Sequence, residues 1–119
     1  MKYILLIYHD EQAFSRSTED ERQKTYAEYR QLIEELKSSG NYLFGDQLQP
    51  TATAQTVRAR DGKQLITDGP FAETREQVGG FFMIEASDAD EANRIAARIP
   101  SARTGTIEVR PVVEAQQKQ

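Results

Sequence analysis

The 119-residue chain contains no cysteine and no tryptophan, and it has a single histidine, His9. Without cysteine, disulfide bonds, thiolate nucleophiles and cysteine-based zinc sites are excluded, and one histidine cannot build a multi-histidine metal centre. No apolar run approaches the roughly 20 residues that span a bilayer, and Met1-Lys2 leads into a strand pattern rather than a signal peptide. We therefore expect a cytoplasmic protein with no cofactor, although a metal site made of carboxylates alone stays open.

Basic residues are also in short supply. Fifteen lysines and arginines stand against 19 acidic residues, so the formal net charge is −4. Because a basic patch is the usual footprint of nucleic-acid binding, direct nucleic-acid binding is disfavoured. The length allows one domain with a modest core. We place this domain at residues 1–113 and expect a disordered tail over residues 114–119.

Hydrophobic patterning predicts two central strands. Residues 3–8 are apolar at successive positions, and residues 81–85 carry apolar groups on both faces, which is typical of strands buried on both faces. Residues 42–48, in which Gly45 suggests a bulge, and residues 106–113 predict outer strands. A hairpin is predicted from residues 55–67, because Asp61-Gly62 is a two-residue turn signal.

Two helices are predicted from their caps. Thr18 and Glu21 form a capping-box pattern that opens a helix ending near Ser39, and Asp88 or Ser87 caps a second helix that Pro100 ends. Residues 9–17 are expected to form a loop. The chain therefore belongs to the α+β class, and its order of elements is that of a ferredoxin-like βαββαβ fold with an added hairpin.

Two helices can cover only one face of the sheet. The other face would expose several hundred Å² of apolar side chains, which monomers rarely tolerate. We expect a second copy to cover it, giving a homodimer in the form of a dimeric α+β barrel.

The segment from Thr67 to Glu76, which begins Thr-Asp-Gly-Pro-Phe, resembles the Asp-Gly-Pro-Phe signature of the YCII-related family. The resemblance covers roughly residues 1–113, with Arg75 where the family usually has lysine. It implies the same dimeric barrel. Some members resemble hydrolases or isomerases with a His-Asp pair, and members are often encoded beside extracytoplasmic-function sigma factors.

Asp68 has two open interpretations. It can cap its own turn, in which Gly69 adopts a conformation that other residues resist. Alternatively, it can act as a general acid or base beside Phe71, with His9 as its partner.

Charged residues on the predicted strands and loop either form solvated faces or bind a ligand. The candidate ligand-binding residues are Tyr8, Arg58, Glu73, Arg75, Glu76, Glu108 and Arg110, with Tyr42 and Phe82 as further apolar walls. These residues support a dimeric small-molecule binder or enzyme with a pocket near the Asp-Gly-Pro-Phe loop. The alternatives are a regulatory module that docks a sigma factor through Glu34-Glu35 or residues 73–76, and a structural dimer without activity.

Overall fold

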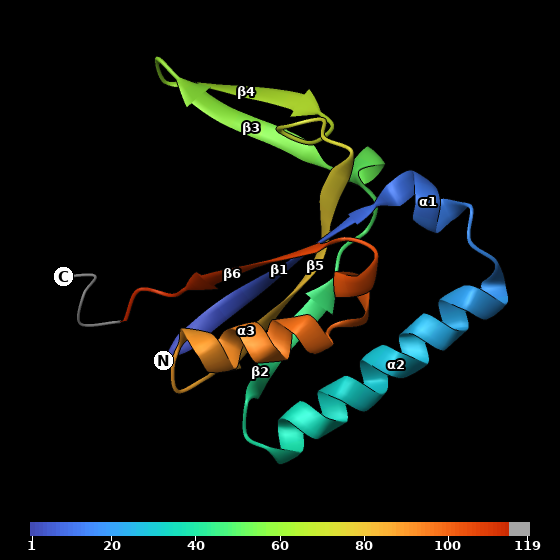
Figure 1. Ribbon diagram of the computed structural model, residues 1–119. Coiled ribbons are helices and arrows are strands. Elements are labelled where there is room, and N and C mark those ends of the chain that lie inside the picture. Colours follow the sequence, from blue (N-terminus) through green and yellow to red (C-terminus); the bar gives the residue numbers. More distant parts are fainter. Residues whose placement is uncertain (115–119) are drawn as a thin grey trace.

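The computed structural model describes residues 1–114 and has an α+β architecture (Figure 1). The strands are β1 (Lys2–Asp10), β2 (Tyr42–Gln47), β3 (Gln55–Arg60), β4 (Lys63–Asp68), β5 (Glu76–Glu85) and β6 (Thr106–Pro111). The helices are α1 (Glu11–Ser15), α2 (Glu19–Ser38) and α3 (Ala89–Arg98), with short 3-10 turns at Thr51–Thr53 and Pro100–Arg103. None of the helices within residues 1–114 is long and apolar enough to cross a membrane.

Four strands form one antiparallel sheet in the order β2-β5-β1-β6. The two strands predicted to be central, β1 and β5, are the inner pair. Their register places Leu5 opposite Phe82 and Ile4 opposite Met83. Because side chains alternate between the two faces of a strand, each of these pairs lies on a different face of the sheet.

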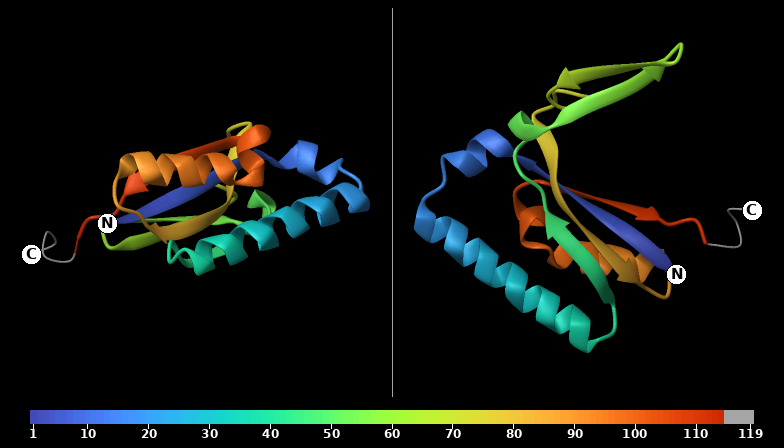
Figure 2. Two further views of the ribbon diagram at one scale, coloured as in Figure 1. Left: turned by 60° about the horizontal axis from the view of Figure 1, so that its bottom comes forward. Right: turned by 180° about the vertical axis from the view of Figure 1, so that it is seen from behind.

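The core fills the space between one face of this sheet and the helices. Figures 1 and 2 show α2 and α3 on the same side of the sheet. The buried residues come from that face and from the two helices: Tyr3, Leu5, Ile7, Leu32, Leu36, Phe82, Ile84, Ala86, Ala92, Ile95, Ala96 and Ile99. α3 contributes Ala92, Ile95 and Ala96, which recur at helical spacing and form its buried stripe.

Local capping signals define the helix boundaries. Thr18 accepts a hydrogen bond from the backbone N–H of Glu21, whose carboxylate accepts one from Thr18 N–H, so the predicted capping box is complete. Asp88 caps α3 in the predicted way.

The predicted hairpin is formed by β3 and β4, which make a separate two-stranded sheet. Asp61 and Gly62 have φ values of 53° and 74°, the positive values that a tight two-residue turn requires. The hairpin projects from one end of the main sheet (Figure 2), and the chain as a whole measures 48 × 47 × 18 Å. Its Cα radius of gyration is 16.4 Å, whereas a compact domain of this length has about 13.5 Å.

Several predicted boundaries and roles are wrong. Residues 9–17 are not a loop, because β1 continues to Asp10 and α1 follows, so the described chain has three α-helices rather than two. The irregularity in β2 lies between Tyr42 and Phe44, not at Gly45. Tyr42 and Phe82 pack edge to face with ring centroids 5.3 Å apart and belong to the core side, so they are not walls of an open pocket. Most of the tail predicted at 114–119 lies outside the described residues.

Candidate functional site

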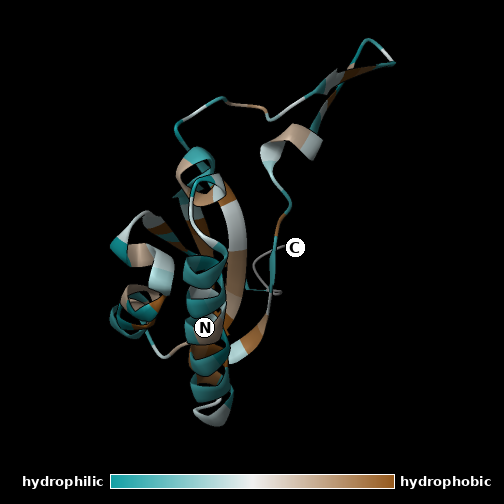
Figure 3. Cartoon of the chain, turned by 90° about the vertical axis from the view of Figure 1, so that its right-hand side faces the viewer, coloured by the Kyte–Doolittle hydropathy of each residue, from teal (hydrophilic) through white to brown (hydrophobic). Residues whose placement is uncertain are grey.

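The face of the sheet opposite the helices is apolar and uncovered. Its central side chains are only half-buried, whereas their neighbours on the helix side are buried. Phe44 is 53% exposed and packs edge to face on Phe81, with centroids 6.0 Å apart. We call this surface the open face; its apolar residues are Ile4, Leu6, Phe44, Phe81 and Met83. In Figure 3, α3 lies to the left of the sheet, and no α-helix within residues 1–114 lies to its right, the side of the open face.

A hydrogen bond between Tyr8 and Glu108 lies at one end of the open face. Tyr8 Oη donates to Glu108 Oε1 over 2.9 Å, because Glu108 stands opposite Leu6 on the neighbouring strand. This bond to a carboxylate raises the pKa of Tyr8, and a smaller contribution from burial acts in the same direction. The phenol therefore keeps its proton as a hydrogen-bond donor.

Two further polar pairs continue along this end of the sheet. Thr106 donates to Glu76 Oε1 over 2.9 Å, and Arg75 Nε donates to Asp10 Oδ2 over 3.3 Å. The backbone N–H of Ala13 and the Arg75 guanidinium hold the pKa of Asp10 below its usual value. We call the set Tyr8, Asp10, Arg75, Glu76, Thr106 and Glu108 the polar band.

Arg110 follows the polar band along β6. It stands opposite Ile4, two positions beyond Glu108, so it belongs to the same face. The Arg110 side chain is exposed and makes no hydrogen bond or ion pair with residues 1–114. A guanidinium in this state is available to bind a carboxylate or a phosphate.

His9 lies on the helix side of the sheet and does not pair with Asp68. Its ring packs edge to face on Phe14, with centroids 5.6 Å apart. A Cβ on Gly79 would clash with its Nε2 atom, so the ring lies against the β5 backbone where that strand has no side chain. The hypothetical His9–Asp68 pair fails because β1 continues past Tyr8 and directs His9 toward α1.

Asp68 is exposed at the end of β4. Its Oδ1 atom accepts a hydrogen bond of 3.3 Å from the Gln55 side chain, which is its partner across the hairpin. The turn-cap interpretation is therefore not what the structure shows either, because the bond goes to a side chain of another strand. Gly69 has φ of 101°, a conformation that glycine adopts without strain, as predicted.

The other candidates on the hairpin and loop lie apart from the polar band. Arg58 stacks over Phe71, with its guanidinium carbon 5.4 Å from the ring centroid, although Phe71 is 79% exposed. Glu73 is exposed and makes no hydrogen bond or ion pair within the described chain. The structure thus lines up Tyr8, Arg75, Glu76 and Glu108 on one face, with Arg110 beyond Glu108 at the level of Ile4, six positions along β1 from the Asp10–Glu76 pair. It leaves His9, Arg58, Asp68 and Glu73 outside this group.

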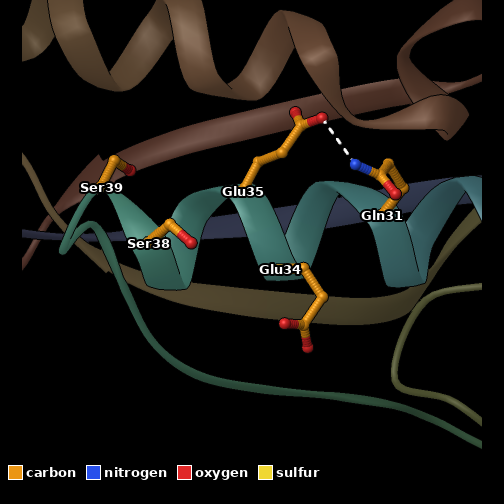
Figure 4. A pocket seen from close by; sticks show the side chains of 5 residues that line it. All are labelled: Gln31, Glu34, Glu35, Ser38 and Ser39. Carbon is orange, nitrogen blue, oxygen red and sulfur yellow. Dashed lines mark hydrogen bonds between the residues drawn. The ribbon is translucent and has the colours of Figure 1, made fainter.

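Two surface depressions occur elsewhere, along α2. One is lined by Gln31, Glu34, Glu35, Ser38 and Ser39 (Figure 4), and the other lies between α2 and α3. All five residues of the first are exposed, and Glu35 already binds Gln31 at 3.0 Å and Arg98 at 2.7 Å. Within residues 1–114, no three His, Asp or Glu side chains are grouped closely enough to hold a metal ion. We therefore take the open face, not α2, as the candidate site.

Comparison with known proteins identifies the family of the chain. The family model of the YCII-related domain matches residues 1–116. The chain belongs to the YCII-related family. A curated protein of Rhizobium meliloti (strain 1021), named only as uncharacterised, is 34% identical over 114 residues, which cover 94% of this chain and 92% of that protein. The resemblance stated from the sequence is thus confirmed at the level of the family.

Two members of the polar band in this YCII-related domain were not predicted from the sequence. Asp10 caps α1 by accepting from the N–H groups of Gln12 and Ala13, and an Asp at the end of a strand is a recognisable cap signal. Thr106 gives no such signal, because its partner Glu76 is 30 residues away and the contact depends on the strand order.

Proposed function

We propose that this YCII-related protein is a homodimer that binds a small molecule at the polar end of its open face. The chain would be of the ferredoxin-like type, for which the order β2-β5-β1-β6 with two crossover helices is typical, and two copies would stack as a dimeric α+β barrel. The Asp68 to Phe71 segment supports assignment to the Asp-Gly-Pro-Phe subgroup.

One observation carries the ligand proposal: Arg110 has no described ion-pair partner and lies beside the Tyr8–Glu108 pair on an apolar floor. Leu6 and Phe81 stand opposite each other and offer a flat apolar contact. Binding sites typically combine such apolar walls with a few polar groups that fix orientation. The ligand class that fits is a small amphiphilic anion, with its carboxylate or phosphate on Arg110 and its apolar part on Leu6 and Phe81.

The test is a titration of the purified protein with benzoate and with phenyl phosphate, in which binding is monitored by amide chemical shifts. Saturable shifts confined to β1, β5 and β6 around Tyr8 are expected, and Arg110→Gln should weaken binding by about tenfold or more, the loss of one charge-assisted contact. Arg94→Gln on α3 is the matched control, because Arg94 is exposed and lies outside the open face. Equal weakening by both variants, or no saturation, would show that Arg110 is not an anion anchor.

A regulatory role with a sigma factor stays a prediction. Glu34 and Glu73, both exposed, would be available to a partner. A catalytic role for Asp68 has less support, since its carboxylate is exposed and bonded only to Gln55 within the described chain. Proton transfer needs contact with the reacting group in a site that holds it.

A further inference from the structure

The hairpin formed by β3 and β4, called the arm below, has no supporting layer. All six residues of β4 and five of the six in β3 are exposed. An isolated two-stranded hairpin is marginally stable in water. The arm nevertheless has an unbroken ladder from Gln55–Asp68 to Arg60–Lys63. The surface that would stabilise this ladder is not supplied by residues 1–114 of the same chain.

The two faces of the arm differ in chemistry. Cross-strand partners share a face, so Val57, Ala59 and Ile66 lie together on one side. The polar partners Gln55, Gln64 and Asp68 flank them on that side. The opposite side carries Arg58, Arg60 and Lys63, with Leu65 and two threonines between them. Val57 and Ile66 are directly opposite each other and are 61% and 57% exposed. Such β-branched pairs stabilise a sheet when another surface covers them, so the centre of this face fits an apolar protein surface with polar groups at its margin.

The exposed area of the chain indicates which protein surface covers the arm. The chain exposes 8448 Å² for a mass of 13.5 kDa, whereas a compact monomer of that mass exposes about 6,500 Å². An excess of about 1,900 Å² lies in the range that each chain of an obligate dimer buries. The open face alone supplies too little. The four strands have 6, 10, 9 and 6 residues in the order of the sheet, and at about 4.8 Å between strands and about 3.3 Å per residue they cover roughly 500 Å² in projection. This is below the roughly 800 Å² that each partner buries in a typical stable complex.

The arm also points toward the side of the sheet on which a second copy would lie. In Figure 3 the arm projects upward and to the right, whereas α3 lies to the left of the sheet, so the arm leans toward the side of the open face. A second copy stacked on the open face would therefore lie beside the arm, and the two surfaces would form one continuous interface.

We propose that the arm docks on the second copy of this chain through the apolar face formed by Val57, Ala59 and Ile66, an inference that rests on the proposed homodimer. Each copy extends its arm beyond its own sheet and receives the arm of its partner. The cationic face of the arm, with Arg58 stacked on Phe71, remains on the outer side. The open face and the arm together provide the area that neither provides alone.

Hydrogen exchange of the full-length protein, measured together with sedimentation velocity, tests this docking. The amides of β3 and β4 are expected to be protected in the dimer and to lose protection on dilution below the dissociation constant. The double variant Val57→Thr, Ile66→Thr keeps β-branched side chains but removes apolar contact. It should raise the dissociation constant roughly tenfold or more and abolish protection of the arm.

The double variant Arg60→Gln, Lys63→Gln is the matched control on the opposite face of the arm, and it should change neither readout. Because the arm lies outside the core, protection of β1 and β5 reports that every variant is folded. A dimer whose arm exchanges like a free hairpin would overturn the docking of the arm while leaving the open-face dimer intact. A wild-type protein that stays monomeric at tens of micromolar would overturn both, since no second copy is then present.

Discussion

Tyr8 donates its phenol proton to Glu108 on a face that is otherwise apolar. The bond raises the pKa of Tyr8 in the folded protein, so the group contributes stability below its unfolded pKa of about 10. That contribution is lost as the pH rises through the raised value. Glu108→Gln replaces the carboxylate with a neutral amide, and we expect it to lower the pKa of Tyr8 toward the ordinary value.

The measurement is tyrosinate absorbance against pH, with Tyr8→Phe used to assign the Tyr8 transition. Glu76→Gln is the control, because Glu76 belongs to the polar band but bonds Thr106 rather than Tyr8. A Tyr8 transition that is identical in wild type and Glu108→Gln would show that the hydrogen bond does not set this pKa.

The partners of single side chains were the feature that the sequence predicted least well. Asp68 was interpreted through its chain neighbours, as a turn cap or as the partner of His9, yet it bonds Gln55 across the hairpin. His9 was assigned to a loop, but the strand continues through it and turns its ring toward Phe14. Both errors have one cause. A side chain selects its partner by strand register, which local sequence does not specify.

Elements with local signals were predicted well. The capping residues Thr18 and Asp88, and the Asp61-Gly62 turn, each depend on bonds within four residues, and the structure has all three. The helix α1 was missed because it has only five residues and its cap, Asp10, is also the last residue of a strand. Gly45 predicts the irregularity of β2 at the wrong position, because the register shifts next to Leu43.

The His9 ring of β1 lies between Phe14 of α1 and the backbone of Gly79 in β5, and this packing can be tested. Gly79→Ala introduces a Cβ that clashes with the His9 ring, so we expect it to lower the free energy of unfolding by about 1–3 kcal/mol, as overpacking does. In the His9→Ala background the clash is gone. Because Ala is favoured over Gly in a strand by roughly 0.5–1 kcal/mol, the same change should then be neutral or stabilising.

A double-mutant cycle from urea unfolding of the four proteins measures this coupling. Glu73→Ala serves as the control, because Glu73 is exposed in the preceding loop and has no described partner. If Gly79→Ala has the same effect in both backgrounds, His9 does not rest on Gly79 in solution.

At the scale of the whole molecule, the sequence predicts that only one face of the sheet is covered by helices. Strands apolar on both faces and few helices implied one covered and one uncovered face. The structure places both long helices on one side and leaves the other side open (Figure 1). The Asp61-Gly62 turn predicts that the arm is a hairpin. The position of the arm could not be predicted, because its direction depends on how the chain leaves β2 and enters β5.

Leu5 and Met83 distinguish the two faces of the sheet. Leu5 is fully buried among the helices, whereas Met83 is half-buried on the open face. Leu5→Glu should therefore unfold the protein, because an unpaired buried charge costs several kcal/mol or more and total stability is only about 5–15 kcal/mol. Met83→Glu should fold but remain monomeric, because its charge would lie within the proposed interface.

Circular dichroism and sedimentation velocity read out folding and mass separately for each variant. Ala97→Glu adds the same charge on the exposed side of α3 and should stay dimeric and folded. Ala97→Glu and Met83→Glu change the net charge, −4 in the wild type, by the same amount. A difference in mass between the two variants therefore reflects where the charge lies. Burying an unpaired carboxylate against an apolar surface is costly. A Met83→Glu protein that keeps the mass of a dimer would therefore show that the interface lies elsewhere.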